Sequence, residues 1–205
     1  MGYSTNFTGD LSLSRPATDV EKNYINTFSG TRRMKRDVNK LMELFKGKHG
    51  HPTPKSDKPE DIYGNDGEYF AMDDGQSGQN HDSSILDYNT PPGHLLDRSI
   101  DWQQVWAENQ SRIHDGKCQP GLWCQWIIEE QIVGEQVLAW DGGEKFYYYV
   151  EWLKYLINHF FEPWGIKLNG EIEWEGEDSS DRGRIIVTDN KVKVQIGKTV
   201  YEDAD

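Results

Sequence analysis

Residues 140–189 read WDGGEKFYYYVEWLKYLINHFFEPWGIKLNGEIEWEGEDSSDRGRIIVTD and contain the two strongest patterns of the chain. Apolar side chains recur there at spacings of three and four, which predicts a helix from Glu144 to Glu162. Pro163 should end this helix, because a proline inside a helix lacks the donor N–H and clashes with the preceding turn. Alternation from Asn169 to Asp178 then predicts a half-buried strand. We therefore expect the fold to be organised around this helix and the sheet that contains this strand.

The predicted helix carries two stripes of large side chains. One stripe should face a core; it consists of Phe146, Tyr149, Val150, Leu153, Leu156, Ile157 and Phe160. A second stripe steps by four, three and four residues and consists of Tyr148, Trp152, Tyr155 and His159. Two interpretations of the second stripe remain open. Another segment of the chain covers it, or it is an exposed aromatic anchor for a partner, because Trp and Tyr dominate interface hot spots.

The predicted strand has a row of glutamates on one face, opposite Ile172 and Trp174. The row consists of Glu171, Glu173, Glu175 and Glu177. Successive members lie about 7 Å apart and repel one another unless they are paired. The next segment, Arg182–Ile196, predicts a hairpin that turns at Asp189 and Asn190. Its polar face offers possible partners for the glutamates, namely Arg184, Lys191 and Lys193. The row is therefore either neutralised across strands or forms an acidic ladder that a cationic partner could bind.

The rest of the chain supplies further strands and helices. Tyr3–Leu13 alternates and predicts a strand with a bulge or bend at Gly9. Thr18 followed by Glu21 has the spacing of a capping box and predicts the start of a helix. Additional elements are expected at Lys35–Phe45 (helix), Leu122–Ile128 (strand) and Gln136–Trp140 (strand). Helices and hairpins without strict alternation predict an α+β fold, with a mostly antiparallel sheet and two main helices packed on one face.

We expect a single domain over residues 1–205, in which residues 47–118 form a loop-rich insertion. Gly, Pro, Asp, Ser and Asn crowd the chain between Gly47 and Gly93, and such composition is typical of loops. So long a loop in a compact domain is usually functional or disordered. A short helix is expected only within Leu95–Ile113.

Composition and charge restrict the classes of function. The 205 residues have a formal net charge of −13, with 35% hydrophobic and 12% aromatic residues. Residues 32–58 nevertheless contain nine basic and three acidic residues. An acidic body disfavours general affinity for nucleic acid or anionic membranes, although the basic segment could make a local contact. No apolar run approaches the roughly 20 residues that cross a bilayer, and the first residues lack the features of a signal peptide. A cytoplasmic location is therefore expected.

Motifs of known chemistry are missing from the sequence. The histidines do not fall at zinc-binding spacings, residues 74–78 lack the lysine of a phosphate loop, and G-x-S-x-G does not occur. Cys118 and Cys124 are the only cysteines, and in a reducing compartment we expect two free thiols. The sequence therefore predicts no catalytic residue, no metal site and no cofactor, and a non-enzymatic role is favoured.

Five phrases of the sequence resemble those of small acidic proteins of tailed phages and prophages. They are Gly2–Gly9, Leu86–Pro92, Gln119–Trp126, Trp140–Phe146 and Gly170–Asp178. The resemblance covers both ends and the middle of the chain. It implies a phage protein that acts in the cytoplasm of the host cell. That group has no firmly assigned activity, so the resemblance implies no residue roles.

Three classes of function follow as hypotheses. The first is an accessory, anti-defence-like protein that binds and inhibits or modulates a host protein, including one that binds nucleic acid, because an acidic surface can occupy a cationic groove. Its candidate contacts are the second aromatic stripe and the glutamate row. The second is a small ligand-binding domain or hydrolase with an aromatic-lined pocket. That pocket would be rimmed by Trp123, Trp126, Trp140, Asp141 and Glu144. The third is a virion or assembly component.

Overall fold

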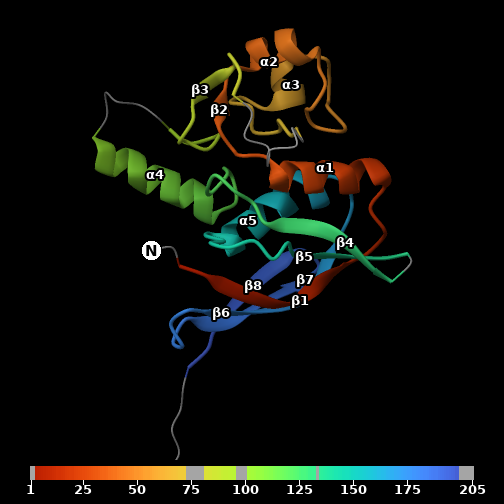
Figure 1. Ribbon diagram of the computed structural model, residues 1–205, viewed down its shortest axis with the longest axis vertical. Helices are drawn as coiled ribbons and strands as arrows, with labels where there is room; N and C mark the ends of the chain where they lie inside the picture. The colour runs from red at the N-terminus through yellow and green to blue at the C-terminus, as the bar shows by residue number, and fades with distance from the viewer. Residues whose placement is uncertain (1–2, 73–80, 96–100, 133, 199–205) are drawn as a thin grey trace, which may run out of the picture.

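A six-stranded antiparallel sheet forms the base of the computed structural model, which describes residues 3–72, 81–95, 101–132 and 134–198 (Figure 1). The strands follow the order β4-β5-β1-β6-β7-β8. Their bounds are β1 (Thr5–Leu13), β4 (Trp126–Ile132), β5 (Glu135–Trp140), β6 (Leu168–Gly176), β7 (Arg182–Thr188) and β8 (Lys191–Ile196). The predicted α+β class and antiparallel sheet are confirmed.

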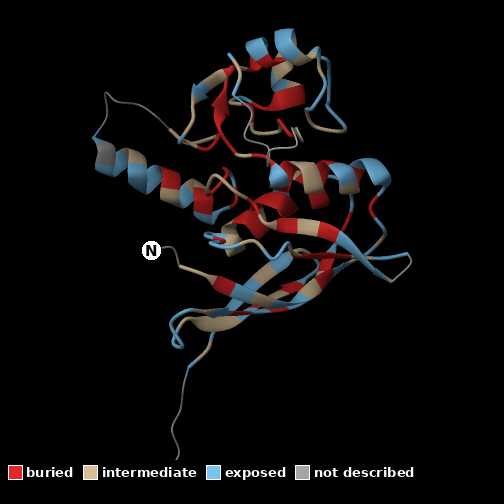
Figure 2. Cartoon of the chain, in the orientation of Figure 1, coloured by how far each residue is buried: buried red, intermediate tan, exposed pale blue. Residues whose placement is uncertain are grey.

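Two helical segments cover one face of this sheet. They are α1 (Asp19–Gly30) and α5 (Tyr149–Leu156), and α5 continues into the π-helix η1 (Ile157–Phe161). Figure 2 shows buried residues concentrated where these helices meet each other and the sheet. The core there is rich in aromatic side chains, including Phe28, Trp126, Trp152, Tyr155 and Phe160. In the described part of the chain no helix lies on the opposite side of β6, β7 and β8 (Figure 1).

Local sequence signals explain where α1 and the last hairpin form. The Thr18 side chain accepts a hydrogen bond from the Glu21 backbone N–H, and the Glu21 carboxylate accepts one from the Thr18 N–H, which is the predicted capping box. The hairpin of β7 and β8 turns at Asp189 and Asn190, whose φ angles of 48° and 68° suit a type I′ turn. Both predictions are confirmed.

Strand β1 pairs with β6 along its whole length, so of the bulge or bend that we predicted at Gly9 the bulge is absent. Gly9 lies opposite Ile172 in a continuous register. Its φ is +95°, and a Cβ built there would lie 2.4 Å from the carbonyl oxygen of Glu171. Glycine therefore allows the two strands to approach closely, and the register stays unbroken.

The main helix begins later than predicted, at Tyr149 instead of Glu144. Lys145 and Tyr148 have positive φ angles of 62° and 57°, so residues 141–148 cannot be helical. Asp141 accepts a hydrogen bond from the Gly143 N–H, and Gln125 donates one to the Glu144 carbonyl. These two hydrogen bonds, one within the turn and one to the distant Gln125, fix the loop before the helix. The helix start predicted at Glu144 is therefore wrong.

The strand predicted at Leu122–Ile128 is displaced to β4, and the helix predicted at Lys35–Phe45 is shorter. Lys35 and Arg36 instead form β2, which pairs with β3 (Ile85–Asp87). Asp37 then caps α2 (Val38–Phe45) by accepting hydrogen bonds from two backbone N–H groups. Pairing with a distant strand has overridden the local helical pattern.

The region expected to be a loop-rich insertion holds more regular structure than predicted. It contains α3 (Pro59–Tyr63) and β3, which were not predicted, and α4 (Trp102–His114), which overlaps the short helix expected within Leu95–Ile113. With α2 it builds a second small core from Val38, Leu41, Ile62, Tyr63 and Phe70. The apolar residues of α2 and α3 bury one another, which sequence periodicity over such short helices does not reveal. Residues 73–80 and 96–100 of the insertion lie outside the described residues.

None of the helices in the described part of the chain is both long and apolar enough to cross a membrane. Cys118 and Cys124 are buried free thiols, in agreement with the prediction.

Candidate functional site

The aromatic stripe predicted as a partner anchor is largely covered by the protein itself. Trp152 is 0% exposed and Tyr155 is 1% exposed. The ring of Phe28 on α1 stacks against Tyr155, and Gln119 donates a 3.1 Å hydrogen bond to the Tyr155 hydroxyl. Only Tyr148 remains exposed, and it lies before the helix begins. The interpretation in which another segment covers the stripe is therefore correct, and the exposed anchor is wrong for Trp152 and Tyr155.

The glutamate row lies on the open face of the sheet, and its pairing differs from the prediction. Arg184 on β7 forms a 2.9 Å ion pair with Glu171. Lys191 and Lys193 lie on β8, which β7 separates from β6, so they are not cross-strand neighbours of the row. Glu173 and Glu175 are exposed beside this pair. Arg184 therefore supplies the observed ion pair with the glutamate row, and the predicted contacts with Lys191 and Lys193 are wrong.

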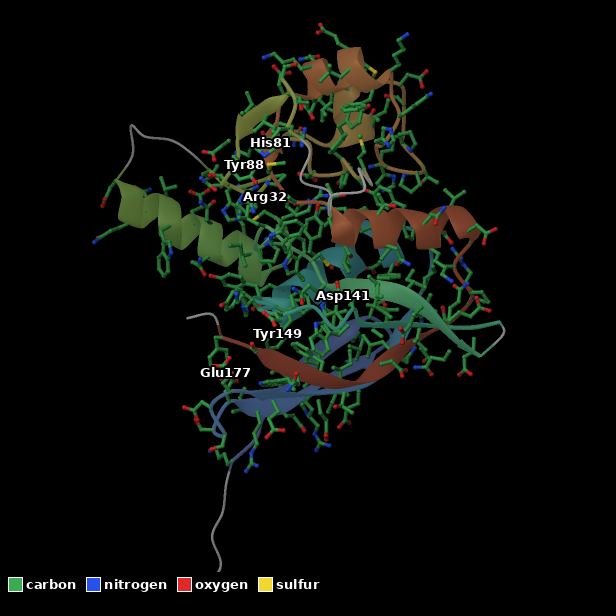
Figure 3. All side chains as sticks on the ribbon, viewed as in Figure 1. Arg32, His81, Tyr88, Asp141, Tyr149 and Glu177 are labelled. Carbon is green, nitrogen blue, oxygen red and sulfur yellow. The ribbon has the colours of Figure 1, made fainter. Side chains whose placement is uncertain are left out.

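Glu177, the last member of the row, lies beyond the end of β6. Its carboxylate accepts a 2.8 Å hydrogen bond from the backbone N–H of Ser4. Figure 3 shows Glu177 at one end of the sheet, where the chain enters β1. It therefore helps to fix the first residues of β1 at this edge.

Of the five residues of the predicted aromatic pocket, Trp126 cannot rim an open cavity, because its side chain is fully buried. It donates a 2.9 Å hydrogen bond to the Tyr149 carbonyl. Trp140 donates to Gln125, whereas Trp123 lies 5.9 Å from the guanidinium of Arg32. Figure 3 shows Asp141 beside Tyr149 near the sheet and Arg32 in another part of the molecule. Trp126 belongs to the core because β4 packs against α1, where Ser29 donates a hydrogen bond to the Trp126 carbonyl, whereas Glu144 is exposed.

The structure instead forms a cleft of about 500 Å³ between the insertion and the end of the main helix. One wall comes from residues 51–69 of the insertion, and the other comes from η1 and the turn after it. The lining is mostly polar and includes His51, Lys55, Glu60, Asp61, Glu68, Tyr69, Asn158, His159 and Trp164. Concave sites with convergent polar groups are the usual form of small-molecule sites.

A chain of hydrogen-bonding groups lies at the inner end of this cleft. The Tyr69 hydroxyl is 3.2 Å from Nδ1 of His159, and it also contacts the Glu68 carboxyl group. His159 further hydrogen-bonds the backbone of Gly116 and stacks on Tyr155 with centroids 4.1 Å apart. In a neutral imidazole one nitrogen donates and the other accepts. Tyr69 can therefore donate a hydrogen bond to Nδ1 of His159 while its oxygen accepts one from a protonated Glu68.

Burial shifts the acid–base behaviour of these groups. Desolvation raises the pKa of Glu68 above its ordinary value, although the hydrogen bond from Tyr69 lowers it. Desolvation also lowers the pKa of His159 to about 4 and raises the pKa of Tyr69. The Glu68 and His159 side chains are still 16% and 19% exposed. Perturbed groups that reach a cleft are characteristic of functional sites, although structural networks can produce similar shifts.

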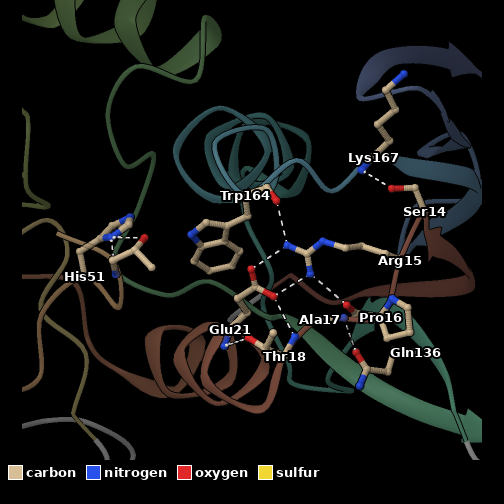
Figure 4. Close-up of polar contacts among 11 residues, drawn as sticks. Ser14, Arg15, Pro16, Ala17, Thr18, Glu21, His51, Gln136, Trp164 and Lys167 are labelled. Carbon is tan, nitrogen blue, oxygen red and sulfur yellow. Dashed lines mark hydrogen bonds and ion pairs between the residues drawn. The ribbon is translucent and has the colours of Figure 1, made fainter. Parts of the chain in front are cut away.

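Two further aromatic groups, His51 and Trp164, close the cleft on the side of α1. Their ring centroids are 6.3 Å apart, and Figure 4 shows the indole nitrogen of Trp164 on the side of the ring that faces His51. This indole N–H is buried and has no hydrogen-bond partner in the described part of the chain. Arg15 holds the backbone of Trp164 by donating to its carbonyl while its guanidinium pairs with Glu21 (Figure 4).

The local backbone presents His159 to the cleft from a widened helical turn. The Glu162 N–H donates to the Ile157 carbonyl at 2.9 Å, five residues back, as in a π-helix. Such turns are rare and are frequent at functional sites. On the facing wall, Tyr24 donates to the Tyr69 carbonyl at 2.9 Å and Arg33 donates to the Glu68 carbonyl at 2.9 Å. Buried groups of the body thus position both residues of the insertion.

Sequence reasoning had selected only His159 among these residues, and for another role. His51, Glu68 and Tyr69 lie in the segment that was predicted to be loop, and their distance along the chain from His159 gives no periodic signal. The available signal was weaker: Tyr69 and Phe70 are two adjacent aromatic residues in a polar segment. In the described residues no group of three or more His, Cys, Asp or Glu side chains is arranged to hold a metal ion.

A search with this chain found no matching protein-family model, no matching curated protein and no matching solved structure.

Proposed function

We propose that this protein binds a small polar molecule in the cleft between the insertion and η1. The observation that carries the proposal is the chain formed by Glu68, Tyr69 and His159 at the inner end of a cleft of about 500 Å³. Burying a carboxyl group and an imidazole costs free energy. An apolar contact would hold the insertion against η1 at a lower cost. A ligand that uses these groups gives a reason for their presence.

The shape and lining of the cleft support a small molecule better than a protein surface. Its walls combine ring faces of Trp164 and Tyr69 with polar side chains such as Asn158 and Thr53. Ligand sites pair apolar or aromatic walls with a few placed polar groups that fix orientation. This proposal keeps the ligand-binding class that the sequence suggested and moves the site to different residues.

The test is a thermal-shift screen with sugars, nucleosides, amino acids and polyamines, repeated on two matched variants. Tyr69→Phe removes the hydroxyl at the centre of the chain and keeps the ring, so we expect it to abolish or strongly reduce the shift of any ligand found. Tyr148→Phe removes an exposed hydroxyl outside the cleft and should leave the shift unchanged. If no compound raises the melting temperature of the wild type, or if ligands act equally on both variants, the proposal is wrong.

A second candidate is binding of a host macromolecule through the open face of the sheet, as expected for an anti-defence-like phage protein. The observation that favours it is the exposure of Glu173 and Glu175 on a face that no helix of the described residues covers. Electrostatic complementarity mainly accelerates association. Replacing Glu171, Glu173 and Glu175 with Gln should therefore slow association with a partner captured from host lysate, most strongly at low salt. Equal association rates for wild type and variant at low ionic strength would exclude this role of the row.

A further inference from the structure

The Glu68 carboxyl group is mostly withdrawn from solvent, and no lysine or arginine among the described residues forms an ion pair with it. In the described part of the chain its nearest ion-pairing group is Nδ1 of His159, at 4.0 Å. His159 is neutral at physiological pH because burial lowers its pKa to about 4. The groups that act on Glu68 electrostatically are Arg33, Asp66, Tyr69 and Arg112. Arg33 directs its Nη2 to the backbone carbonyl of Glu68, not to the carboxylate.

The charges around the cleft disfavour an anionic ligand. The lining of the cleft contains three acidic residues (Glu60, Asp61 and Glu68) and one basic residue (Lys55). The protein as a whole carries −13. A field of this sign repels phosphates and carboxylates and attracts cations. A positively charged ligand is therefore favoured both at the rim and at the inner end of the cleft.

The aromatic walls favour a cation that also offers hydroxyl groups or ring surface. Trp164 and Tyr69 can contact an ammonium group or the adjacent C–H groups through their ring faces. Thr53, Asn65 and Asn158 supply side chains that can exchange hydrogen bonds with hydroxyls. A hydroxylated primary amine, of which an amino sugar is the simplest cyclic example, matches all of these groups.

Building on the proposed ligand site, we propose that the ligand is a small hydroxylated amine whose ammonium group is bound by the Glu68 carboxylate. Tyr69 then donates its hydroxyl hydrogen to the ionised Glu68 carboxylate and holds it in place. Where Glu68 is protonated in the free protein, binding of the ammonium group displaces that proton, which passes to solvent. Binding of the amine should consequently strengthen as pH rises toward and through the range in which Glu68 ionises.

The experiment compares glucosamine, glucose and glucose 6-phosphate by isothermal titration calorimetry at pH 7.5, with the amide of Nα-acetyl-lysine as a probe for a peptide lysine. We expect glucosamine to bind at least about tenfold more tightly than glucose and the phosphate to bind worst. The lysine probe shows whether the same ammonium chemistry could come from a peptide. Binding of glucosamine should weaken as the pH falls through the range in which Glu68 becomes protonated, whereas binding of glucose should not.

Variants separate this inference from the ligand site itself. Glu68→Gln should remove the preference for glucosamine over glucose, whereas Glu43→Gln, at an exposed position of α2 outside the cleft, should keep it. Glu68→Asp retains the charge and should bind the amine more tightly than Glu68→Gln does, which controls for disturbed packing. If glucose and glucosamine bind equally in a Tyr69-dependent manner, the ligand site stands and the ammonium assignment is wrong. If no probe and no compound of the screen binds, both proposals fail.

Discussion

The guanidinium group of Arg33 donates a 2.9 Å hydrogen bond to the backbone carbonyl of Glu68 and thereby ties the cleft to the protein interior. Arg33 is 1% exposed, and desolvation lowers its pKa to about 10. Its remaining donors reach the Phe70 carbonyl at 2.7 Å and the Gln119 side chain at 3.1 Å. Arg33 therefore joins the insertion, the segment around Gln119 and the core through one planar group.

Replacing Arg33 with Lys should destabilise the protein by about 2–4 kcal/mol. A lysine has a single ammonium group and cannot serve three separated acceptors, so buried carbonyls of the insertion lose their partners. Urea denaturation followed by tryptophan fluorescence measures the change. Arg32→Lys is the matched control, because Arg32 is partly exposed and lies over the Tyr88 ring; it should cost about 1 kcal/mol or less. Equal losses for the two variants would show that Arg33 does not act as a hub.

Substitutions on the buried face of α5 should also destabilise the protein. Leu153 is 0% exposed, and Leu153→Ala should cost about 2–5 kcal/mol because it leaves a cavity in a close-packed core. Leu44→Ala provides the comparison, since Leu44 is a helical leucine that is 47% exposed, and its loss should stay below about 1 kcal/mol. Urea melts of both variants test the difference. A loss below about 0.5 kcal/mol for Leu153→Ala would contradict the observed packing of α5.

Gly9 should tolerate no side chain, because β1 and β6 meet closely there. Alanine at this position needs an unfavourable positive φ and places Cβ 2.4 Å from the Glu171 carbonyl oxygen. We expect Gly9→Ala to destabilise by about 2 kcal/mol or more. At Gly30, at the end of α1, a Cβ meets nothing within 4 Å, so Gly30→Ala should be neutral or slightly stabilising. Thermal denaturation of both variants by circular dichroism checks this contrast.

Local chemistry made parts of this fold predictable from sequence. The capping box of Thr18 and Glu21 and the turn at Asp189 and Asn190 depend on residues within a few positions of one another, and both were found as expected. The start of the main helix was misplaced because distant residues decide it. Gln125 hydrogen-bonds the Glu144 carbonyl, Lys145 and Tyr148 have positive φ angles, and the helix begins only at Tyr149.

The cleft could not be predicted because its walls are brought together only by tertiary packing. Glu68 lies in the insertion and His159 lies in η1. The Glu68 carboxylate and Nδ1 of His159 are 4.0 Å apart in the structure. The helical pattern placed His159 on a stripe with Trp152 and Tyr155, but a stripe does not show which segment covers it. That segment includes Gln119, and its contact with Tyr155 depends on a side-chain amide that periodicity cannot detect.

Titration of the cleft should make stability depend on pH in two opposing ways. For His159 the folded pKa of about 4 lies below the ordinary value of 6.5, so the unfolded chain binds more protons between these values. Its contribution is complete above pH 6.5 and is lost as the pH falls toward 4. For Glu68 the folded pKa lies above the ordinary 4.5, so its contribution is present below pH 4.5 and is lost as the pH rises through the folded pKa.

Single substitutions should separate these two contributions. His159→Phe keeps a ring to stack on Tyr155 and removes the titration, so its stability should fall less steeply than that of the wild type between pH 6.5 and 4, by up to about 1.4 kcal/mol per pH unit. Glu68→Gln should be more stable than the wild type at pH 8 and similar to it at pH 4, because it removes the cost of ionising a buried carboxyl group. Urea denaturation across pH 4–8 measures both differences. Profiles parallel to that of the wild type for both variants would mean that neither group has a shifted pKa in the folded protein.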